Sequence, residues 1–404
     1  MGSNKHTELP SGWEMKRISE LGEVLTGNTP PTNDDSNYGN DFLFVSPFDL
    51  KDNKYIIHTE KMLSSIGFNK SRKFKKGSVL FTCIGSTIGK SGIATCELTS
   101  NQQINAIIVN DSNSNEFLYY QLENQAPKIK LLAGEQAVPI INKTQFEQVK
   151  LPCPLLPEQR AIANILSTWD TAIQTTQTLI SQKGKEKKWL MQNLLTGKKR
   201  LKGFSAEWKE LKLSDIFTPL RDVNDGGDSH SIMTISSKLG LISQEDKFDR
   251  VIAGDSLKKY TQIKKGDFAY NKGNSKTFPM GCIYRLEEKE SALVPFVYIC
   301  FRPNKNVDGS FYKQWFFDHS LDAQLNKIIT SGARGDGLLN VNTDDFFKLK
   351  VPYPQIEEQT AIAQVLQTTD KEIELFKAKL EQQKLQKKGL MQVLLTGKVR
   401  IKYN

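Results

Sequence analysis

Two stretches of the chain carry apolar residues at the alternating four- and three-residue spacing of a long amphipathic helix. The first pattern runs through residues 162–194, and the second repeats it through residues 362–394. Pro157 suits the first turn of a helix, and Gly197 and Gly397 stand where a glycine commonly follows a helix end. About 38 residues lie between these signals, so each helix is predicted to be about 57 Å long.

A helix of this length needs a partner along its apolar seam to be stable in water. The two seams match and share a polar interruption at the same place, so we expect the helices to pair with each other. Because a globular block separates them in the sequence, they are expected to run antiparallel as a coiled coil. The alternative is that each helix packs only against its own globular block. The residues assigned to helix pairing or partner docking are Ile162, Leu166, Trp169, Ile173, Ile180, Leu190 and Leu194, and Ile362, Leu366, Ile373, Phe376, Leu380, Leu390 and Leu394.

The chain repeats itself at an offset of 200 residues. Residues 151–170 and 351–370 are identical at 10 of 20 positions, and residues 187–202 and 387–402 at 12 of 16. A weaker echo, around Trp13 and Trp208, opens each half. Repeats of this kind decide the architecture, so the chain is predicted to be a pseudo-two-fold repeat. The predicted parts are a globular domain at 1–150, a helical spacer at 151–202, a second globular domain at 203–350 and a second spacer at 351–404.

The two globular blocks show the short apolar runs of strands, and each contains one amphipathic helix, which predicts an α/β (α+β) fold. Strands are predicted at residues 42–46, 78–83 and 104–109 and a helix at 115–132 in the first block, and strands at 230–235, 267–270, 280–286 and 293–301 and a helix at 310–329 in the second.

Residues 85–91 read Gly-Ser-Thr-Ile-Gly-Lys-Ser and resemble a phosphate-binding loop only superficially. That motif needs four residues between its glycines and a helix after them, whereas here three residues intervene and a strand pattern follows. The segment therefore predicts two strands joined by a hydroxyl-rich turn. Residues 264–276 follow a related plan in the second block. Such turns can reach base edges or phosphates in a DNA groove, and the alternative is a solvated hairpin.

Several polar residues of the globular blocks are candidates for binding DNA. Residues 70–76 hold five cations and no acid, which suits phosphate contact, although a solvated charge run is the alternative. Amides such as those at residues 101–102 can read adenine, and residues 331–335 form a glycine-rich turn around one arginine. The candidates are Lys70, Arg72, Lys73, Lys75, Lys76, Ser86, Thr87, Lys90, Asn101 and Gln102 in the first block, and Lys272, Asn274, Ser275, Lys276 and Arg334 in the second.

The net charge points to an anionic partner. The 404 residues carry a formal charge of +10, with a pI of about 9.1. The excess of cations lies in residues 181–202 and 381–402, at the C-terminal ends of the two predicted helices. Complementing the helix dipole explains part of this placement, and contact with DNA phosphates or an acidic partner surface is the functional alternative.

Other features favour a cytoplasmic protein that binds and does not catalyse. Five cysteines lack paired spacing, and no apolar run is long enough to span a membrane. Four histidines show no metal-ligand spacing, and no nucleophile elbow occurs. Residues 28–32 read Asn-Thr-Pro-Pro-Thr, which departs from the Asn/Asp-Pro-Pro-aromatic tetrapeptide of an amino-group methyltransferase. We therefore predict no catalytic residue and no metal site.

Two motifs that each occur twice carry a resemblance to a known family. Pro-x-x-x-Glu-Gln-x-Ala-Ile-Ala stands at residues 154–163 and 354–363, and Leu-Met-Gln-x-Leu-Leu-Thr-Gly at 190–197 and 390–397. Together with Ile-Gly-Lys-Ser-Gly-Ile at 88–93, they make nearly the whole chain resemble the specificity subunit of a type I restriction–modification system. The second block departs from the family pattern at its hairpin, where Asn-Ser-Lys-Thr begins at Asn274.

This resemblance implies a function. Each globular block would be a target-recognition domain that reads one half of an asymmetric double-stranded DNA target. The helices would set the spacing of the half-sites and dock two modification subunits, with the restriction subunit joining through the complex. No cofactor is expected on this chain, because S-adenosylmethionine, ATP and magnesium would be bound by the partners. The alternatives are a stand-alone sequence-specific DNA-binding protein, the specificity part of a bipartite type II enzyme, and a coiled-coil scaffold without a DNA role.

Overall fold

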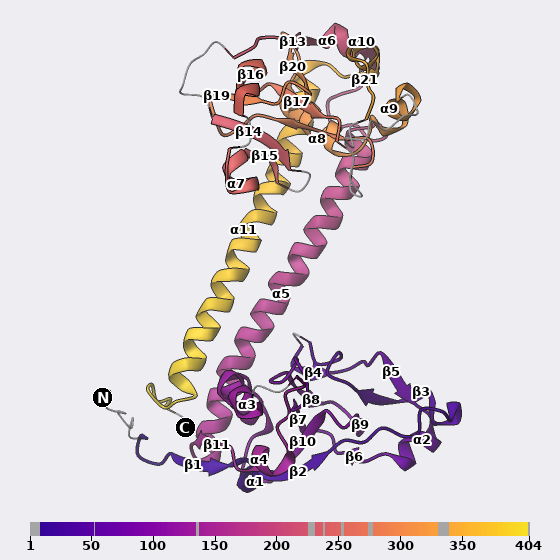
Figure 1. Cartoon of the computed structure of the whole chain (residues 1–404). Helices are drawn as coiled ribbons and strands as arrows, with labels where there is room; N and C mark the ends of the chain where they lie inside the picture. The colour runs from indigo at the N-terminus through magenta and orange to yellow at the C-terminus, as the bar shows by residue number, and fades with distance from the viewer. Residues whose placement is uncertain are drawn as a thin grey trace. The chain divides into compact units, whose positions relative to one another are not determined.

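The computed structural model describes residues 9–51, 53–134, 137–224, 231–236, 239–251, 254–273, 278–329 and 339–402. The chain forms two compact units, one made of residues 1–177 with 378–404 and the other of residues 178–377 (Figure 1). Each unit therefore combines one globular block with one end of each long helix. The C-terminal end of the chain belongs to the first unit.

The two long helices are α5 (Leu156–Leu194) and α11 (Ile356–Leu394), each 39 residues long. Each helix ends three residues before its predicted terminal glycine, Gly197 for α5 and Gly397 for α11. Gly397 instead closes the turn after α11 with a φ of +71°, and a Cβ there would lie 2.5 Å from Cγ of Pro10. The turn after each helix is therefore part of the packing of its unit, and glycine is required by that close contact.

The first unit shows the antiparallel helix pairing in three pairs of contacts. Residues 158, 170 and 176 of α5 contact residues 400, 387 and 383 at the C-terminal end of the chain. Residue numbers therefore rise along α5 while they fall along the C-terminal segment that contacts it, which is the order expected of antiparallel segments. The second unit repeats this order, because residues 183, 187 and 200 contact residues 372, 370 and 358. The predicted antiparallel pairing is thus confirmed within each unit.

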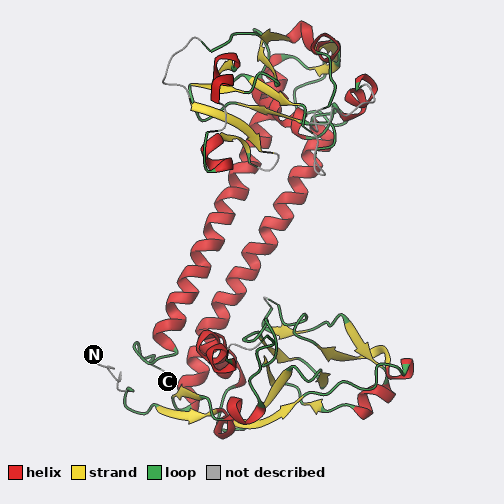
Figure 2. Cartoon of the chain, viewed as in Figure 1, coloured by secondary structure: helices red, strands yellow, loops and turns green. Residues whose placement is uncertain are grey.

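The first globular block contains a five-stranded sheet in the order β2-β10-β7-β8-β4 and a four-stranded sheet in the order β5-β3-β9-β6. Figure 2 shows the strands of both blocks in yellow. The strands β1 and β11 form a separate pair. The elements are β1 (Glu14–Arg17), α1 (Ile18–Leu21), β2 (Gly22–Thr26), η1 (Asp35–Asn37), β3 (Tyr38–Val45), β4 (Tyr55–Ile56), β5 (Lys61–Leu63), α2 (Ser65–Lys70), β6 (Lys73–Phe74), β7 (Val79–Thr82), β8 (Ser91–Ala94), β9 (Leu98–Ser100), β10 (Ile104–Val109), α3 (Asn115–Lys130), η2 (Leu131–Ala133), α4 (Lys143–Glu147) and β11 (Lys150–Cys153). The predicted strands and helix of this block are confirmed, although β3 begins earlier than predicted.

The second globular block has two four-stranded sheets, β13-β20-β17-β18 and β15-β14-β19-β16, and a β12-β21 pair. Its elements are β12 (Lys209–Lys212), α6 (Leu213–Ile216), β13 (Phe217–Leu220), β14 (Ser231–Ser236), β15 (Gly240–Ser243), α7 (Gln244–Phe248), η3 (Gly254–Lys259), β16 (Thr261–Lys264), β17 (Phe268–Asn271), β18 (Cys282–Arg285), β19 (Ser291–Val294), β20 (Ile299–Pro303), α8 (Gly309–Phe317), α9 (Asp322–Ile328), α10 (Thr343–Phe347) and β21 (Lys350–Tyr353).

Two predictions for the second block were wrong in detail. Residues 293–301 form parts of two strands, because Pro295 begins a turn in which the Tyr298 amide donates to the Pro295 carbonyl. The predicted helix at 310–329 is two helices, α8 and α9, because His319 adopts a left-handed φ of +58° between them. Proline cannot donate to a strand ladder and a left-handed residue stops a helix, so both breaks have a local cause.

Both units repeat one way of packing a tryptophan at the end of a long helix. In the first, Trp13 lies beside Gly397 and meets Phe117 edge-on, with ring centroids 6.5 Å apart. In the second, Trp208 lies beside Gly197 in the same way and meets the Phe311 ring at 6.2 Å. The weak sequence echo around the two tryptophans therefore marks equivalent contacts.

The five cysteines differ in exposure, which gives a direct prediction. Cys96 is exposed, whereas burial raises the pKa of Cys83 and Cys300 to about 12 and that of Cys153 and Cys282 to about 11. Because the thiolate is the reactive form, we expect one fast-reacting thiol in the native protein at pH 8. Titration with an aromatic disulfide reagent measures this number, and Cys96→Ser is expected to remove the fast phase. More than one fast thiol in the native wild-type chain would contradict the packing described above.

Candidate nucleic-acid interface

Three segments far apart in the sequence meet at one place in the first globular block. They are residues 26–29 after β2, residues 70–73 at β6, and residues 101–103 after β9. We call this set the polar edge. Gly27 lies at its centre, where a Cβ atom would come within 2.3 Å of both the Asn101 carbonyl oxygen and the Ser100 hydroxyl. The Gly27 amide also donates to the carbonyl of Ile104 at 3.0 Å. The backbones can approach this closely only because residue 27 has no side chain.

Asn28 joins the first of these segments to the second. Its amide nitrogen donates to the Lys70 carbonyl at 3.3 Å, and its amide oxygen accepts from the Arg72 backbone at 2.6 Å. The Arg72 guanidinium in turn donates to the Thr26 carbonyl. Since a guanidinium has five N–H donors, this contact fixes the exposed side chain of Arg72 and leaves it further donors for a ligand.

Gln102 is the exposed amide of the polar edge. The Thr29 hydroxyl donates to its side-chain oxygen at 2.8 Å, which links the first segment to the third. Both polar ends of the Asn101 side chain are engaged by Gln103, through its side-chain oxygen and its backbone amide. Asn101 therefore shapes the turn that presents Gln102, and the Thr29 hydroxyl holds the side-chain oxygen of Gln102.

The hydroxyl-rich turn lies beside the polar edge. It joins the antiparallel strands β7 and β8, as predicted. Ser86 is exposed and Thr87 is half-buried. Gly85 lies next to Gln103, since a Cβ at residue 85 would be 3.6 Å from the Gln103 amide nitrogen. The Lys130 ammonium also donates to the Ser86 carbonyl at 3.5 Å. The turn and the amides of residues 101–103 are thus neighbours in space.

The cations of residues 70–76 do not form one cluster. Lys70 is exposed, but its ammonium contacts Asn37 at 2.8 Å and Asp34 at 3.2 Å. Hydrogen bonds from Ser36, and then from Lys70, lower the pKa of Asp34. Lys73 donates to Asn69 at 2.9 Å and stands over the Phe68 ring. Partners of this kind restrain two of the predicted phosphate contacts.

The other predicted lysines lie in different surroundings. Lys75 and Lys76 are exposed in the turn before β7, and the hydroxyl-rich turn follows that strand. Four residues of strand separate these two turns, a length of about 13 Å. Lys90 is exposed, with its ammonium 3.4 Å from the Pro47 carbonyl. Lys75 and Lys76 therefore lie at the other end of β7 from the hydroxyl-rich turn.

The second globular block shows the related hairpin only in part. The strands β17 and β18 pair antiparallel, as predicted. Lys272 follows β17, is half-buried, and its carbonyl accepts from the Leu339 amide at 2.9 Å. The remaining candidates of this block, Asn274, Ser275, Lys276 and Arg334, lie outside the described residues.

The seam residues of the long helices face inward in both units. Ile162 and Leu166 share one apolar core with Leu394, and Leu194 shares another with Ile362 and Leu366. The other eight are half-buried, namely Trp169, Ile173, Ile180, Leu190, Ile373, Phe376, Leu380 and Leu390. Large apolar residues outside the seam remain exposed on the helices, among them Leu375 and Leu385, each 70% exposed.

The described part of the chain shows neither a cluster of metal ligands nor a helix suited to cross a membrane. Among these residues, no three side chains of His, Cys, Asp or Glu gather where they could hold a metal ion. Within the same residues, no helix combines the length and the hydropathy that a membrane crossing requires. The contacts on the polar edge suit recognition, since they hold donors and cations at a surface without burying them.

Comparison with known proteins gives this arrangement a context. A family model described as "Type I restriction modification DNA specificity domain" matches residues 10–182 and 206–384. The MjaVIII type I restriction enzyme specificity subunit of Methanocaldococcus jannaschii is 26% identical over 427 aligned positions, which cover 98% of this chain and 94% of that protein. The HindI type I restriction enzyme specificity subunit of Haemophilus influenzae is 35% identical over 151 positions, covering 36% of this chain and 33% of that protein.

Solved structures share the fold. The type I restriction–modification S subunit from M. genitalium has a TM-score of 0.57 and covers 98% of both chains. The HsdS subunit from Thermoanaerobacter tengcongensis has a TM-score of 0.53 and covers 98% of this chain and 99% of its own. Sequence identity is 15% in both cases. At this identity the likeness concerns the fold.

Proposed function

This chain belongs to the family of type I restriction modification DNA specificity domains, and we propose from that premise that each of its two domains reads one half of a bipartite DNA target. It is a specificity subunit with two target-recognition domains. The two family matches, at residues 10–182 and 206–384, are the single observation that carries the proposal. Because the two domains differ in sequence while the helices repeat, the two half-sites should differ and the target should be asymmetric.

The polar edge and the adjoining hydroxyl-rich turn are the proposed reading surface of the first domain. Arg72 and Gln102 are its base-reading candidates, since a guanidinium can bind guanine and an amide can bind adenine in the major groove. Lys70, Lys73 and Lys90 are candidates for phosphate contact, which fixes register without reading sequence. The exposed Ser86 supplies a further hydroxyl donor and acceptor. The hairpin β17–β18 is the corresponding candidate in the second domain.

The two long helices are the proposed spacer and docking site. Their seams are used by packing within each unit, so a partner would bind the outer faces, where Leu375 and Leu385 are exposed. We propose that two modification subunits dock there and that the restriction subunit joins through them. S-adenosylmethionine, ATP and magnesium would then be held by those partners. A structure solved to explain complex assembly of a type I restriction–modification system has a TM-score of 0.59 to this chain and supports the proposal through its fold.

Exchanging one domain tests whether each domain reads its own half of the DNA target. Replacing residues 10–150 with the corresponding block of a related specificity subunit is expected to change one half of the DNA target and leave the other unchanged, because each domain would read independently. Mapping methylated adenines in host DNA by single-molecule sequencing measures both halves at once. A change in both halves would refute the assignment of one half-site to each domain.

The salt dependence of the affinity for duplex DNA distinguishes the proposed function from that of a scaffold without a DNA role. A protein that neutralises several phosphates loses affinity steeply as salt increases. A flat salt response of duplex binding by the full chain with its partners would favour the scaffold. A stand-alone DNA-binding protein would instead bind its specific site equally well with and without the modification subunits.

A further inference from the structure

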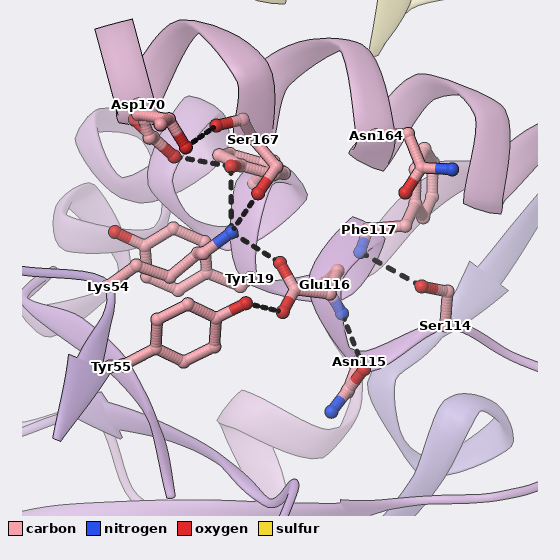
Figure 3. A network of polar contacts seen from close by, with 12 residues as sticks. Lys54, Tyr55, Ser114, Asn115, Glu116, Phe117, Tyr119, Asn164, Ser167 and Asp170 are labelled. Atoms are coloured by element: carbon pink, nitrogen blue, oxygen red, sulfur yellow. Dashed lines mark hydrogen bonds and ion pairs between the residues drawn. The ribbon is translucent and has the colours of Figure 1, made fainter. Parts of the chain in front are cut away.

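A buried lysine ties the first domain to the long helices. Lys54 lies directly before β4 and is 7% exposed. Its ammonium donates to the Glu116 carboxylate at 2.5 Å, to the Tyr120 hydroxyl at 3.1 Å and to the Ser167 hydroxyl at 2.9 Å (Figure 3). Lysine is almost never buried unless it is paired, and here all three donors of the ammonium have an acceptor.

The contacts of Lys54 continue into a network that reaches α11. The Tyr120 hydroxyl donates to Asp170 of α5, and the other oxygen of Asp170 lies 2.6 Å from the Lys387 ammonium. On the opposite side, the Tyr55 hydroxyl donates to Glu116 at 2.5 Å. We call these residues, Lys54, Tyr55, Glu116, Tyr120, Ser167, Asp170 and Lys387, the clasp. It joins four elements, since β4, α3, α5 and α11 each contribute a member.

The clasp is connected to the proposed reading surface through the sheet. β4 is the edge strand of the five-stranded sheet and pairs with β8. The carbonyl of Lys54 itself accepts from the Ile93 amide of β8 at 2.8 Å. The strands β8 and β7 carry the hydroxyl-rich turn, so one strand pairing joins the backbone of Lys54 to the hairpin that ends in that turn.

An open groove lies on this side of the first domain. The helix α3 packs on α5 through one core that includes Phe117, Tyr120, Ile162 and Leu166. Beside the clasp, however, lies a groove of about 800 Å³, whose lining includes Ile57 of the domain. The first domain is therefore held on its helices by the core around α3, by polar contacts such as that of Gln121 with the Leu395 carbonyl at 2.7 Å, and by the clasp at β4. Removal of the clasp leaves space in the groove for β4 to move.

The second unit is held in another way. The carboxylate of Asp370, which the repeat places opposite Asp170, contacts Lys187 at 2.6 Å and Gln314 of α8 at 3.1 Å. A neutral amide thus stands in the second unit where the first unit has a tyrosine that is hydrogen-bonded to a buried lysine. Among the described residues, the second block is held on α11 by neutral donors, as where Thr360 donates to Asp308 at 2.8 Å, and the buried lysine is a feature of the first unit.

We propose that Lys54 is a positioning residue that fixes the angle of the first domain on its helices and thereby restricts the spacing at which the two half-sites are accepted. This inference rests on the proposed function. Adding one base pair to the spacer moves a half-site by about 3.4 Å and rotates it by about a tenth of a turn. A domain held by the clasp cannot follow that movement, whereas a domain released from it can.

The test compares spacing with base recognition in the full chain assembled with its modification subunits. Three duplexes are needed: the natural target, the target with one base pair added to its spacer, and the target with one base pair changed in the first half-site. The double variant Lys54→Met, Glu116→Gln removes both charges of this ion pair, so that no charge is left alone. We expect its preference for the natural spacer to fall about tenfold, while discrimination against the changed base pair stays within about twofold.

Two milder variants keep the test decisive if the double variant is poorly folded. Tyr55→Phe removes only the hydroxyl that holds Glu116 and should relax spacing in the same direction by a smaller factor. Lys54→Arg keeps the charge and should retain most of the preference. Lys313→Met removes the exposed ion pair of Lys313 with Glu287 in the second unit and is the matched control, with no change expected.

The outcomes separate the clasp from the proposed function. Equal loss of spacing preference and base discrimination would show that the clasp only stabilises the domain, and an unchanged spacing preference would refute the proposal directly. If the wild-type complex itself failed to distinguish the changed base pair, the assignment of DNA reading to the first domain would fail instead.

Discussion

Replacing Arg400 with methionine is expected to lower the free energy of unfolding of the first unit by about 3 kcal/mol. The Arg400 guanidinium binds both oxygens of Glu158, at 2.7 and 2.8 Å, and also donates to the Ser11 carbonyl at 2.8 Å. Glu158 lies in the first turn of α5 and is 1% exposed. Removal of the guanidinium leaves that carboxylate buried and unpaired, which costs more than the loss of a surface ion pair.

Chemical denaturation of the full chain measures this effect. Lys398→Met, which removes an exposed cation two residues away, is the control and should change the free energy by less than about 0.5 kcal/mol. Adding Glu158→Gln to the Arg400 variant should recover part of the loss, because no buried charge then remains. Equal stability of the Arg400 and Lys398 variants would show that the pair does not stabilise the first unit.

The same prediction applies to the second unit. Arg200 binds both oxygens of Glu358, each at 2.5 Å, and the Trp208 indole donates to the same carboxylate at 2.9 Å. Glu358 is also 1% exposed. Because each unit contains the beginning of one long helix and the end of the other, these two pairs fix the beginning of each helix to the segment that follows the other.

Replacing Gly27 with alanine is expected to weaken binding of the natural DNA target by about 100-fold while leaving the fold intact. The new Cβ would lie 2.3 Å from the Asn101 carbonyl oxygen, so residues 100–102 must move. That movement displaces Gln102, and the neighbouring Asn28 contacts shift Arg72 with it. A wrong base pair costs about 1–3 kcal/mol, and two displaced readers together account for the expected factor.

The measurement uses the complex of the full chain with its modification subunits and two duplexes. On the natural target the Gly27 variant should bind weakly. On a target with a scrambled first half-site, the variant and the wild type should bind alike, because the readers contribute nothing there. Gly184→Ala is the control, since a Cβ at residue 184 meets nothing within 4 Å. Unchanged affinity of the Gly27 variant for the natural target would remove the polar edge from the proposed reading surface.

Local sequence signals predicted the elements well where a period or a repeat was long. The two long helices, the antiparallel hairpin of β7 and β8 and the helix α3 follow from spacing and from turn residues. Predictions were wrong where one residue interrupts a pattern that otherwise continues, as at Pro295 and His319. A hydrophobic pattern is judged over many residues, so a single interrupting residue hardly changes it. The backbone conformation at that point, however, is set by that single residue.

The candidate site was harder to predict than the fold. The composition predicts the cations of residues 70–76 and the amides of residues 101–102, whereas the segment at 26–29 that contacts them carries no binding motif, and Asn28 only begins an incomplete methyltransferase motif. Nothing in a single sequence indicates that Asn28 contacts Lys70 and Arg72, more than 40 residues away. A pair of prolines after a Gly-Asn-Thr run is the only local signal that this segment has a fixed shape.

The sequence alone therefore determined the two-fold repeat, the long helices with their seams, and the family to which the chain belongs. The tertiary structure decided which polar residues share a surface, that Asn28 contacts both Lys70 and Arg72, and that Lys54 is buried. The reason is physical: the spacing of apolar residues along a helix or strand involves only neighbours within a few residues, so the sequence shows it directly. Convergence of segments depends on strand order and on how a domain packs against its helices, which no local pattern contains.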